Sequence, residues 1–226
     1  MAAVRRKSEG YKLTQSVKFI MIDSKCKKCR RAGEKLFLKG DRCYTQKCAM
    51  VKRPYAPGQH GQKRKRAPSE FGVRLKEKQH LRSIYGLREA QFRKYFTSAS
   101  RKKGVTGEEL LKLLESRLDN AVYRAGFASS RSVARQMISH GHINVNGRRV
   151  NIPSYSVKKD NAITIHSGSE KKAIFKGLEV RLKKYEPAAW LSLDKEKIVC
   201  KVLRSPAAED AGFSGNLQWI VEYYSR

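Results

Sequence analysis

The most constraining feature of this sequence is the uneven distribution of its charge. The chain of 226 residues carries 50 Lys and Arg against 20 Asp and Glu, a formal net charge of +30 at pH 7. Residues 1–103 hold 30 of these cations and 7 acids, whereas residues 104–226 hold 20 cations and 13 acids. Like charges at this density repel one another in a compact state unless counterions or a polyanion neutralise them. The first half therefore predicts a basic arm or small domain that contacts phosphates, and the second half an ordinary globular domain.

This charge favours a nucleic acid as the partner. A solvated, highly charged surface is one alternative, and an anionic membrane surface is another, although the latter requires a long basic helix with a clean apolar face. Near the N-terminus the longest apolar stretch is Phe19–Ile22, far below the roughly 18 residues that span a bilayer. We therefore expect no membrane partner and no secretion signal. Hydrophobic residues make up 40% of the chain, which is enough for a sizeable core.

Four of the five cysteines predict a structural zinc site. Two close pairs are joined by thirteen residues, namely Cys26 and Cys29, then Cys43 and Cys48. Such pairs suit a tetrahedral four-thiolate Zn²⁺ site, and the surrounding Lys and Arg favour the thiolate form. The metal would contribute about 10 kcal/mol to the folding of a loop that has little apolar material. Two disulfides are the alternative, and Cys200, in a run typical of a strand, is expected to be a buried thiol.

Composition and periodicity divide the chain into segments. These are a basic N-terminal extension (1–25), a basic region with a four-cysteine zinc site (26–67), a helical region that begins after Ser69 and a compact domain that begins near residue 106. An organelle transit peptide is an alternative interpretation of the extension. In the helical region Leu75, Gln79, Arg82 and Tyr85 are expected on one helix face, and Phe92, Tyr95 and Phe96 show the spacing of an amphipathic helix.

The compact domain shows the pattern of two helices followed by a hairpin. Thr106–Glu109 resembles a capping box, and apolar positions up to Val122 predict one helix that ends at Gly126. Ser129 or Ser130 is expected to cap the second helix, which ends at Gly141. Asn146-Gly147 between short apolar and basic runs is a strong hairpin signal, and residues 163–165 predict a further strand.

This arrangement would gather polar side chains that suit RNA. A helix N-terminus beside a basic hairpin can bind phosphates and the RNA minor groove. The candidates are Arg131, Arg135, His140, His142, Asn144, Arg148 and Arg149, and the basic run Lys63, Arg64, Lys65 and Arg66 is a further candidate for phosphate contact. Solvated surface side chains and, for the basic run, a solvated linker are the alternatives.

Several motifs resemble one family. Residues 118–128, 130–131, 134–136, 140–142 and 145–155 resemble the alpha-L RNA-binding domain of the universal small-subunit ribosomal protein four family. Residues 38–43 and 53–61 resemble the zinc region of its bacterial-type members, and residues 75–79, 84–86, 91–96 and 220–226 resemble its helical body and C-terminal end. The resemblance covers roughly residues 26–226. The long extension before Cys26, and Lys158–Asn161 in place of a Pro-Gly-Asp turn, depart from the family pattern.

The resemblance implies a fold, a function and a set of sites. The fold class is α+β, with an irregular zinc-binding N-terminal region and a helical body into which a domain of two helices on a small antiparallel sheet is inserted. The implied bounds are a helical body over 68–115, the alpha-L domain over 116–168 and a C-terminal segment over 169–226 that completes the helical body. Zinc would fall on the four cysteines above, and RNA contacts on Arg53, Tyr55, Gln59 and His60 as well as Arg131, Arg135, Gln136, His140, His142, Asn144 and Arg148.

The implied function is structural. Family members bind the 5′ domain of small-subunit (16S) rRNA early in assembly, one copy per subunit, and affect translational accuracy. They neighbour small-subunit proteins three and five near the channel by which mRNA enters. The implied location is the ribosome of the cytoplasm or of an organelle.

Two rival functions remain open from the residues. One is an RNA-modifying enzyme with an appended alpha-L domain, yet the sequence shows no convincing nucleophile–base pair and no Gly-rich nucleotide loop. We therefore expect a protein that is not an enzyme. The other is a free-standing rescue factor, which would bind ribosomes reversibly and below one copy per subunit.

Overall fold

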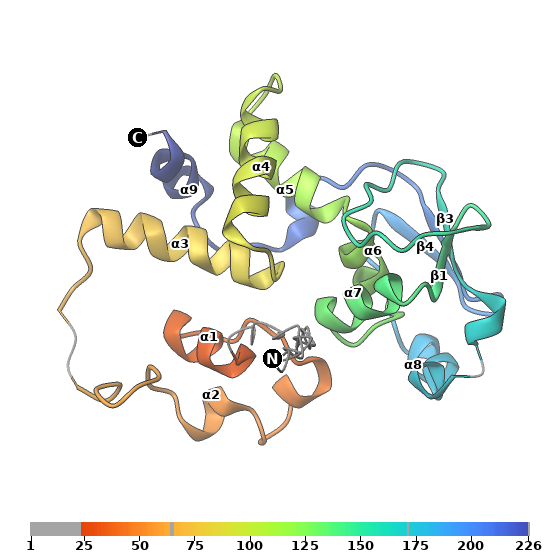
Figure 1. Ribbon diagram of the computed structural model, residues 1–226, viewed down its shortest axis with the longest axis horizontal. Coiled ribbons are helices and arrows are strands. Elements are labelled where there is room, and N and C mark those ends of the chain that lie inside the picture. The colour runs from red at the N-terminus through yellow and green to blue at the C-terminus, as the bar shows by residue number, and fades with distance from the viewer. Residues whose placement is uncertain (1–23, 64–65, 171, 226) are drawn as a thin grey trace, which may run out of the picture.

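The computed structural model describes residues 24–63, 66–170 and 172–225, and their ribbon forms three parts (Figure 1). Short helices α1 and α2 lie along one side, a group of longer helices lies above them, and a sheet with two helices lies beside both. The helices are α1 (Lys25–Ala32), α2 (Ala49–Lys52), α3 (Glu70–Ile84), α4 (Glu89–Ser100), α5 (Thr106–Glu115), α6 (Leu118–Arg124), α7 (Arg131–Ser139), α8 (Leu178–Lys183) and α9 (Leu217–Tyr224). The strands are β1 (Ile143–Val145), β2 (Arg148–Arg149), β3 (Ala162–Ile165), β4 (Leu191–Asp194) and β5 (Val199–Val202).

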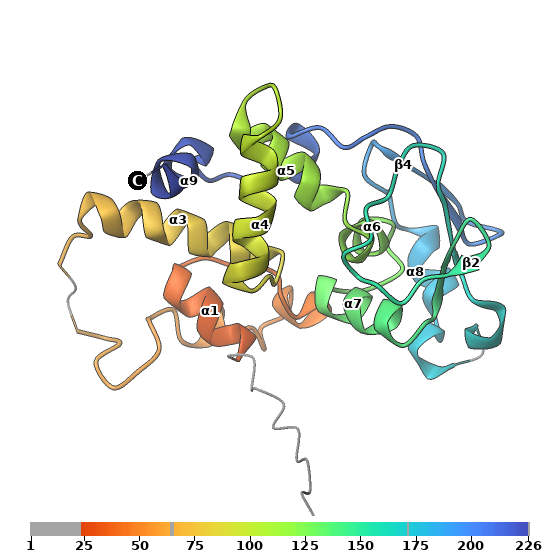
Figure 2. The ribbon, with the colours of Figure 1, turned by 45° about the horizontal axis from the view of Figure 1, so that its top comes forward.

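Helices α3, α4, α5 and α9 form the helical body. Helix α9, from the end of the chain, packs on α3, and α4 packs on α5 (Figure 2). Leu81, Phe92, Leu110, Leu114 and Ile220 are fully buried in its core. Burying a side chain of this size contributes about 1.5–3 kcal/mol. No helix among the described residues is long and apolar enough to cross a membrane.

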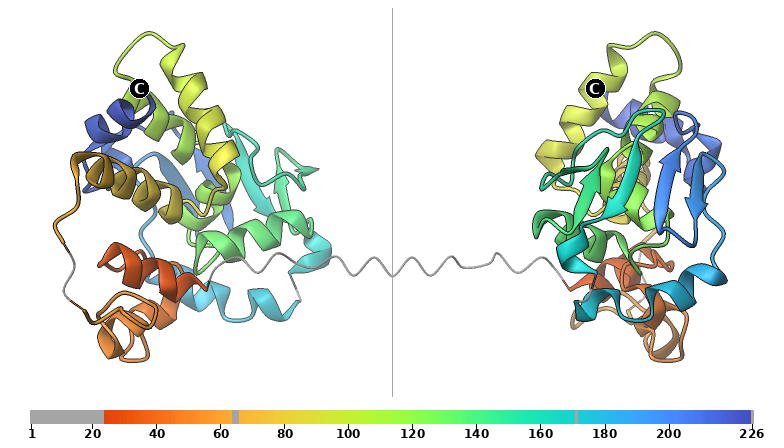
Figure 3. Two further views of the ribbon diagram at one scale, coloured as in Figure 1. Left: turned by 60° about the vertical axis from the view of Figure 1, so that its left-hand side comes forward. Right: turned by 90° about the vertical axis from the view of Figure 1, so that its right-hand side faces the viewer.

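The second core lies between the antiparallel sheet and helices α6 and α7. Its strand order is β2-β1-β3-β5-β4, and the right-hand view of Figure 3 looks onto the sheet. The predicted hairpin is confirmed, since β1 pairs with β2 and the turn residues Asn146 and Gly147 have φ of 51° and 77°. Two consecutive left-handed residues are the requirement of the type I′ turn that Asn-Gly favours. Ser130 caps α7 by accepting from the Val133 N–H, also as predicted.

The C-terminal segment 169–226 contributes to both cores. Strands β4 and β5 extend the sheet, with Ile163 opposite Cys200, whereas the 3₁₀ turn Glu209–Ala211 and α9 pack on the helical body. Short strands of this kind carry little periodicity, so their partner cannot be recognised locally. Cys200 is fully buried on β5 as predicted, and burial raises the pKa of its thiol to about 12.

The predicted capping box and the single long helix were wrong. Val105 precedes the first turn of α5, and the Glu109 carboxylate pairs with Lys112 at 2.8 Å and with Lys102 at 3.5 Å rather than reaching back. The helix also ends at Glu115, because Arg117 is extended, with ψ of 140°, and makes a β-bridge to Ser156. Tertiary contacts from the 153–157 loop therefore override a continuous apolar stripe.

The N-terminal part has little regular structure beyond α1, α2 and a 3₁₀ turn at Gly40–Cys43. Leu36 is buried there and Phe37 is exposed, and residues 36–38 do not form a strand. Of the face predicted for the helix after Ser69, Tyr85 is buried but Gln79 is exposed, and within α3 the buried residues are Lys78, His80 and Leu81. The predicted extension lies outside the described residues except at its last two positions.

Candidate nucleic-acid interface

The four N-terminal cysteines come together around one small cavity. Cys26 and Cys29 lie on α1, Cys43 ends the 3₁₀ turn and Cys48 precedes α2. All four line a cavity of about 20 Å³, and all are free thiols, so the structure contains no disulfide between them. Lys25, Lys39 and Arg42 line the same cavity. The donor set is therefore the one that a thiolate site needs. Even so, no three potential ligands in the described part of the chain stand close enough to hold a metal ion as placed.

A basic groove lies between α1 and α3. It encloses about 520 Å³, and Pro57 and Gly58 of the following loop also line it. Its charged lining is Lys27, Lys28, Arg31, Lys76 and Arg82, together with His80. No Asp or Glu belongs to that lining among residues 24–63, 66–170 and 172–225. Arg82 pairs with Glu89 at 2.9 Å, whereas the other four cations have no ion-pair partner in the described structure. Converging free cations repel one another, so an anion with repeated charges would stabilise the groove.

The loop that carries the predicted contacts Arg53, Tyr55, Gln59 and His60 is fastened to α1. Arg30 donates to the Tyr55 carbonyl at 2.8 Å, and its guanidinium lies 4.8 Å from the centre of the Tyr55 ring. The loop is also tight, since a Cβ on Gly61 would lie 1.9 Å from the Ala56 carbonyl oxygen. The side chains of Arg53, Gln59, His60 and Lys63 on this loop, and that of Arg66 beyond it, are exposed. The predicted contacts Arg64 and Lys65 lie outside the described residues.

The predicted contacts of α7 and the hairpin divide into two groups. Arg131 and Arg135 use their guanidinium groups inside the protein. Arg135 binds Asp119 at 2.7 Å and donates to the carbonyls of Tyr85 and Gly86 at 3.0 and 2.8 Å. Arg131 donates to Asn120 of α6 at 2.8 Å, and its guanidinium lies 4.7 Å from the centre of the Tyr85 ring. Through Tyr85 and Gly86 the two arginines fasten α7 to the helical body.

The second group faces outward. Gln136, His140 and Arg148 are exposed, and Asn144 is half-buried. Arg149 is exposed in part but donates to the carbonyls of Gly141 and His140 at 2.8 and 3.1 Å, which fixes the turn beneath it.

His142 is the buried member of the predicted set. Its Nδ1 lies 2.9 Å from the Ser169 hydroxyl. Burial, and then the charges of Lys172 and His140, lower the pKa of its imidazole. A neutral, buried ring of this kind supports the turn that precedes β1 rather than attracting a phosphate directly.

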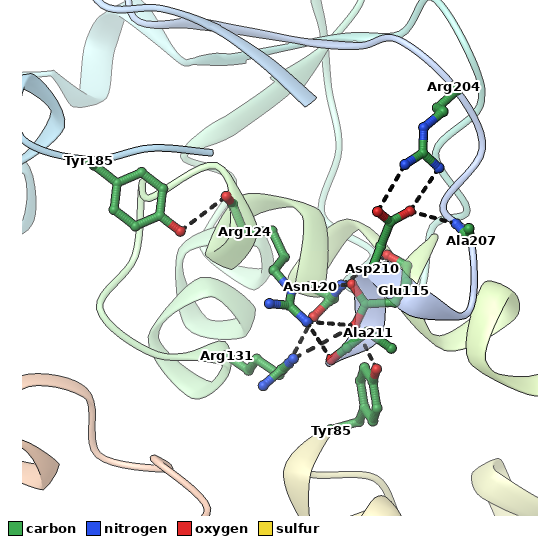
Figure 4. A network of polar contacts seen from close by, with 10 residues as sticks. All are labelled: Tyr85, Glu115, Asn120, Arg124, Arg131, Tyr185, Arg204, Ala207, Asp210 and Ala211. Carbon is green, nitrogen blue, oxygen red and sulfur yellow. Dashed lines mark hydrogen bonds and ion pairs between the residues drawn. The ribbon is translucent and has the colours of Figure 1, made fainter. Parts of the chain in front are cut away.

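A buried polar network joins the helical body to the sheet domain, and sequence reasoning missed it (Figure 4). At its centre Glu115 is fully buried and accepts from Tyr85, from Asn120 at 2.9 Å and from Arg124 at 3.2 Å. Arg131 lies 3.8 Å from the same carboxylate and stacks on Tyr85, 4.7 Å from the ring centre. The only signal in the sequence is an acid at the end of an apolar stripe. The network therefore fixes how the helical body and the sheet domain lie relative to each other.

Comparison with known proteins shows the family of this chain. Residues 21–115 match the model of the ribosomal protein S4/S9 N-terminal domain, and residues 116–163 match that of the S4 domain. The chain is 55% identical over 201 residues to the small ribosomal subunit protein uS4 of Thermus thermophilus, covering 89% of this chain and 96% of the relative. This chain belongs to the uS4 family.

Relatives from other bacteria extend the match. The uS4 proteins of Syntrophomonas wolfei and Caldicellulosiruptor bescii are each 52% identical, over 90% and 91% of this chain and 98% of their own length. The shared part therefore includes the basic N-terminal part, the helical body and the S4 domain. The family resemblance predicted from the motifs is confirmed, while zinc binding and the individual RNA contacts stay predictions.

Proposed function

We propose that this uS4 family member is a structural component of the small ribosomal subunit that binds the 5′ domain of small-subunit rRNA and is not an enzyme. The α1–α3 groove is the observation that carries this function. Four of its cations have no ion-pair partner in the described structure, and consecutive phosphates would neutralise their charge. The exposed side chains of the Arg53–Lys63 loop and of Gln136, His140 and Arg148 add two further surfaces. Arg30 fastens the loop to α1, and the polar network joins the helical body to the sheet domain, so these surfaces would bind several converging RNA helices at once.

Charge reversal in the groove tests the proposal. The variant Lys28→Glu, Arg31→Glu, Lys76→Glu removes three groove cations, and the matched control Lys176→Glu, Lys183→Glu, Lys184→Glu changes the same charge at exposed positions on and beside α8. Binding to a transcript of the 5′ domain is measured between 50 and 200 mM salt, roughly the range over which phosphate contacts are resolved. We expect the groove variant to lower the salt slope by about 2 to 3, at about 0.7–0.9 per phosphate contact.

The two variants distinguish RNA contact in the groove from an effect of net charge alone. The control retains most of its affinity if the groove is the contact. Equal losses in the two variants would show that only net charge matters, and a wild-type chain whose binding does not depend on salt would overturn the proposal.

Zinc binding by the four clustered cysteines belongs to the same proposal. Cys26, Cys29, Cys43 and Cys48 would hold one structural Zn²⁺, which would join α1 to α2 and so set the groove wall. Native mass spectrometry of protein refolded with one equivalent of Zn²⁺ should show one bound ion. The variant Cys29→Ser should lose the ion and Cys200→Ser should keep it. Retention of the ion in the first variant would refute the assignment.

The place in the ribosome is the finer part of the proposal. We infer one copy per subunit, cytoplasmic ribosomes, contacts with small-subunit proteins three and five near the channel by which mRNA enters, and an effect on accuracy. Small subunits washed in high salt and sedimented should retain about one chain per rRNA. A chain that washes off would instead favour a rescue factor.

A further inference from the structure

Two aromatic side chains of the N-terminal part stand outside both cores. Tyr44 is 73% exposed and Phe37 is 39% exposed, and their rings stack with centres 5.0 Å apart at an interplanar angle of 29°. Leu36, the neighbour of Phe37, is buried and anchors the segment. The aromatic pair therefore contributes little to the core and presents a flat apolar surface to solvent, which is costly unless a ligand covers it.

The backbone at Phe37 is held in an unfavourable conformation. Its φ is 50°, in the left-handed region that a bulky residue seldom adopts, which costs on the order of 1 kcal/mol or more. The next turn is pressed against the S4 domain, since a Cβ on Gly40 would lie 2.5 Å from the Ser129 carbonyl oxygen. Contact with the S4 domain thus fixes the position of this segment, and the Phe37 ring lies at the surface rather than in a core. Strain retained beside an exposed aromatic pair points to a binding role.

The pair borders a hollow that suits a flat, aromatic ligand. Phe37 and Tyr44 line a pocket of about 290 Å³, whose other walls include Tyr123 and Arg131. That volume lies near the lower end of the range of about 300–1,000 Å³ for small-molecule sites. The guanidinium of Arg131 already lies 4.7 Å from the Tyr123 ring centre, so aromatic and cationic surfaces alternate there.

The charged side chains near the aromatic pair indicate which class of ligand it would bind. Lys35, Lys39, Arg42 and Lys47 are exposed on the same short segment. Of the two acids nearby, Glu34 pairs with His80 at 3.2 Å and Asp41 is exposed. A pair of stacked rings on a segment that carries exposed cations matches a nucleotide, whose base stacks while its phosphates contact the cations. An apolar protein surface would not use those cations.

We propose that the Phe37–Tyr44 pair is a stacking platform for an unpaired base of single-stranded RNA. This inference rests on the proposed rRNA-binding function and adds to it a site that duplex RNA cannot occupy, because paired bases do not expose their faces. The groove and the α7–hairpin face would bind helices, while the platform holds a base of a junction strand between them.

Comparing the binding of single-stranded and duplex RNA distinguishes base stacking at this site from electrostatic attraction to the chain as a whole. The full chain is compared with Tyr44→Ala, which removes the ring, and with Tyr44→Phe, which keeps it. Binding is measured to a 12-nucleotide oligouridine and to a 12-base-pair RNA duplex, and ultraviolet cross-links are mapped by mass spectrometry. We expect Tyr44→Ala to bind the single strand about 5- to 150-fold more weakly, with duplex affinity unchanged. Tyr44→Phe should match the wild type, and cross-links should map to Phe37 or Tyr44.

The possible outcomes are separable. Circular dichroism spectra of the variants should superimpose, since Tyr44 is on the surface. If Tyr44→Ala binds both probes as the wild type does, the platform is refuted while the proposed function stands. Equal losses for both probes would also refute it, as would cross-links confined to other segments. If the wild type binds neither probe in a salt-dependent way, the proposed function itself fails.

Discussion

Removing the Glu115 carboxylate is the sharpest test of how the two cores are joined. Glu115 is fully buried and balances two arginines, Arg124 and Arg131, while accepting from Tyr85 and Asn120. Removing one partner of a buried ion pair costs about 3–5 kcal/mol, because the other charges are left without compensation. Here the guanidinium-bearing side chains of Arg124 and Arg131 remain 24% and 16% exposed, so water can partly solvate them. We therefore expect Glu115→Ala to cost about 3 kcal/mol, at the lower end of that range.

Two further variants make the magnitude interpretable. Glu115→Gln keeps an acceptor for Tyr85 and Asn120 but loses the charge, so it should cost about 1–2 kcal/mol, since hydrogen bonds to charged groups are the stronger ones. Glu108→Ala, on the exposed side of the same helix, should stay within about 0.5 kcal/mol of the wild type.

Urea unfolding measures all three, with far-ultraviolet circular dichroism and tryptophan fluorescence as probes. Trp190 is buried in the sheet domain and Trp219 lies on α9 of the helical body, so single Trp→Phe variants report each core separately. The network predicts that Glu115→Ala lowers both midpoints. A Glu115→Ala midpoint equal to that of Glu108→Ala would refute this reasoning.

Three further outcomes follow from the packing. Gly126→Ala should destabilise the fold by more than about 1 kcal/mol in the same urea assay, because φ is 82° and the new Cβ would lie 2.6 Å from the Tyr185 ring. Because burial lowers the pKa of His142, the unfolded chain binds a proton first as pH falls below about 6.5, so stability should drop through that range and His142→Asn should remove that part of the pH dependence. An unchanged slope in that variant would contradict the assignment. Finally, Cys200 should resist iodoacetamide in the native protein at pH 8 and react only after denaturation, whereas early labelling would show that β5 opens.

Local patterns were sufficient where a segment's conformation depends on its own residues. Asn146-Gly147 makes the hairpin because it tolerates two left-handed residues, and Ser130 caps α7 because its hydroxyl reaches the Val133 N–H. The four N-terminal cysteines line one cavity, but the zinc site that their spacing predicts stays a prediction. Phe92 and Phe96 are buried as their helical spacing predicts.

Local patterns failed where distant segments decide. The break between α5 and α6 depends on Arg117 pairing with the 153–157 loop, and β4 and β5 join a sheet whose other strands lie earlier in the chain, within residues 143–165. The same holds for function: Arg131 and Arg135 have the sequence of an RNA-binding face, but carboxylates and carbonyls of other elements engage them.

The sequence by itself determined that this chain is a basic protein of the uS4 type, because net charge, cysteine spacing and turn residues are properties of composition and short range. Only the tertiary structure decided which cations are free. A guanidinium that pairs with a buried carboxylate is not available to a phosphate, and that pairing depends on packing. Asp119 pairs with Arg135, whereas Lys28 and Lys76 line the α1–α3 groove with no carboxylate in its described lining.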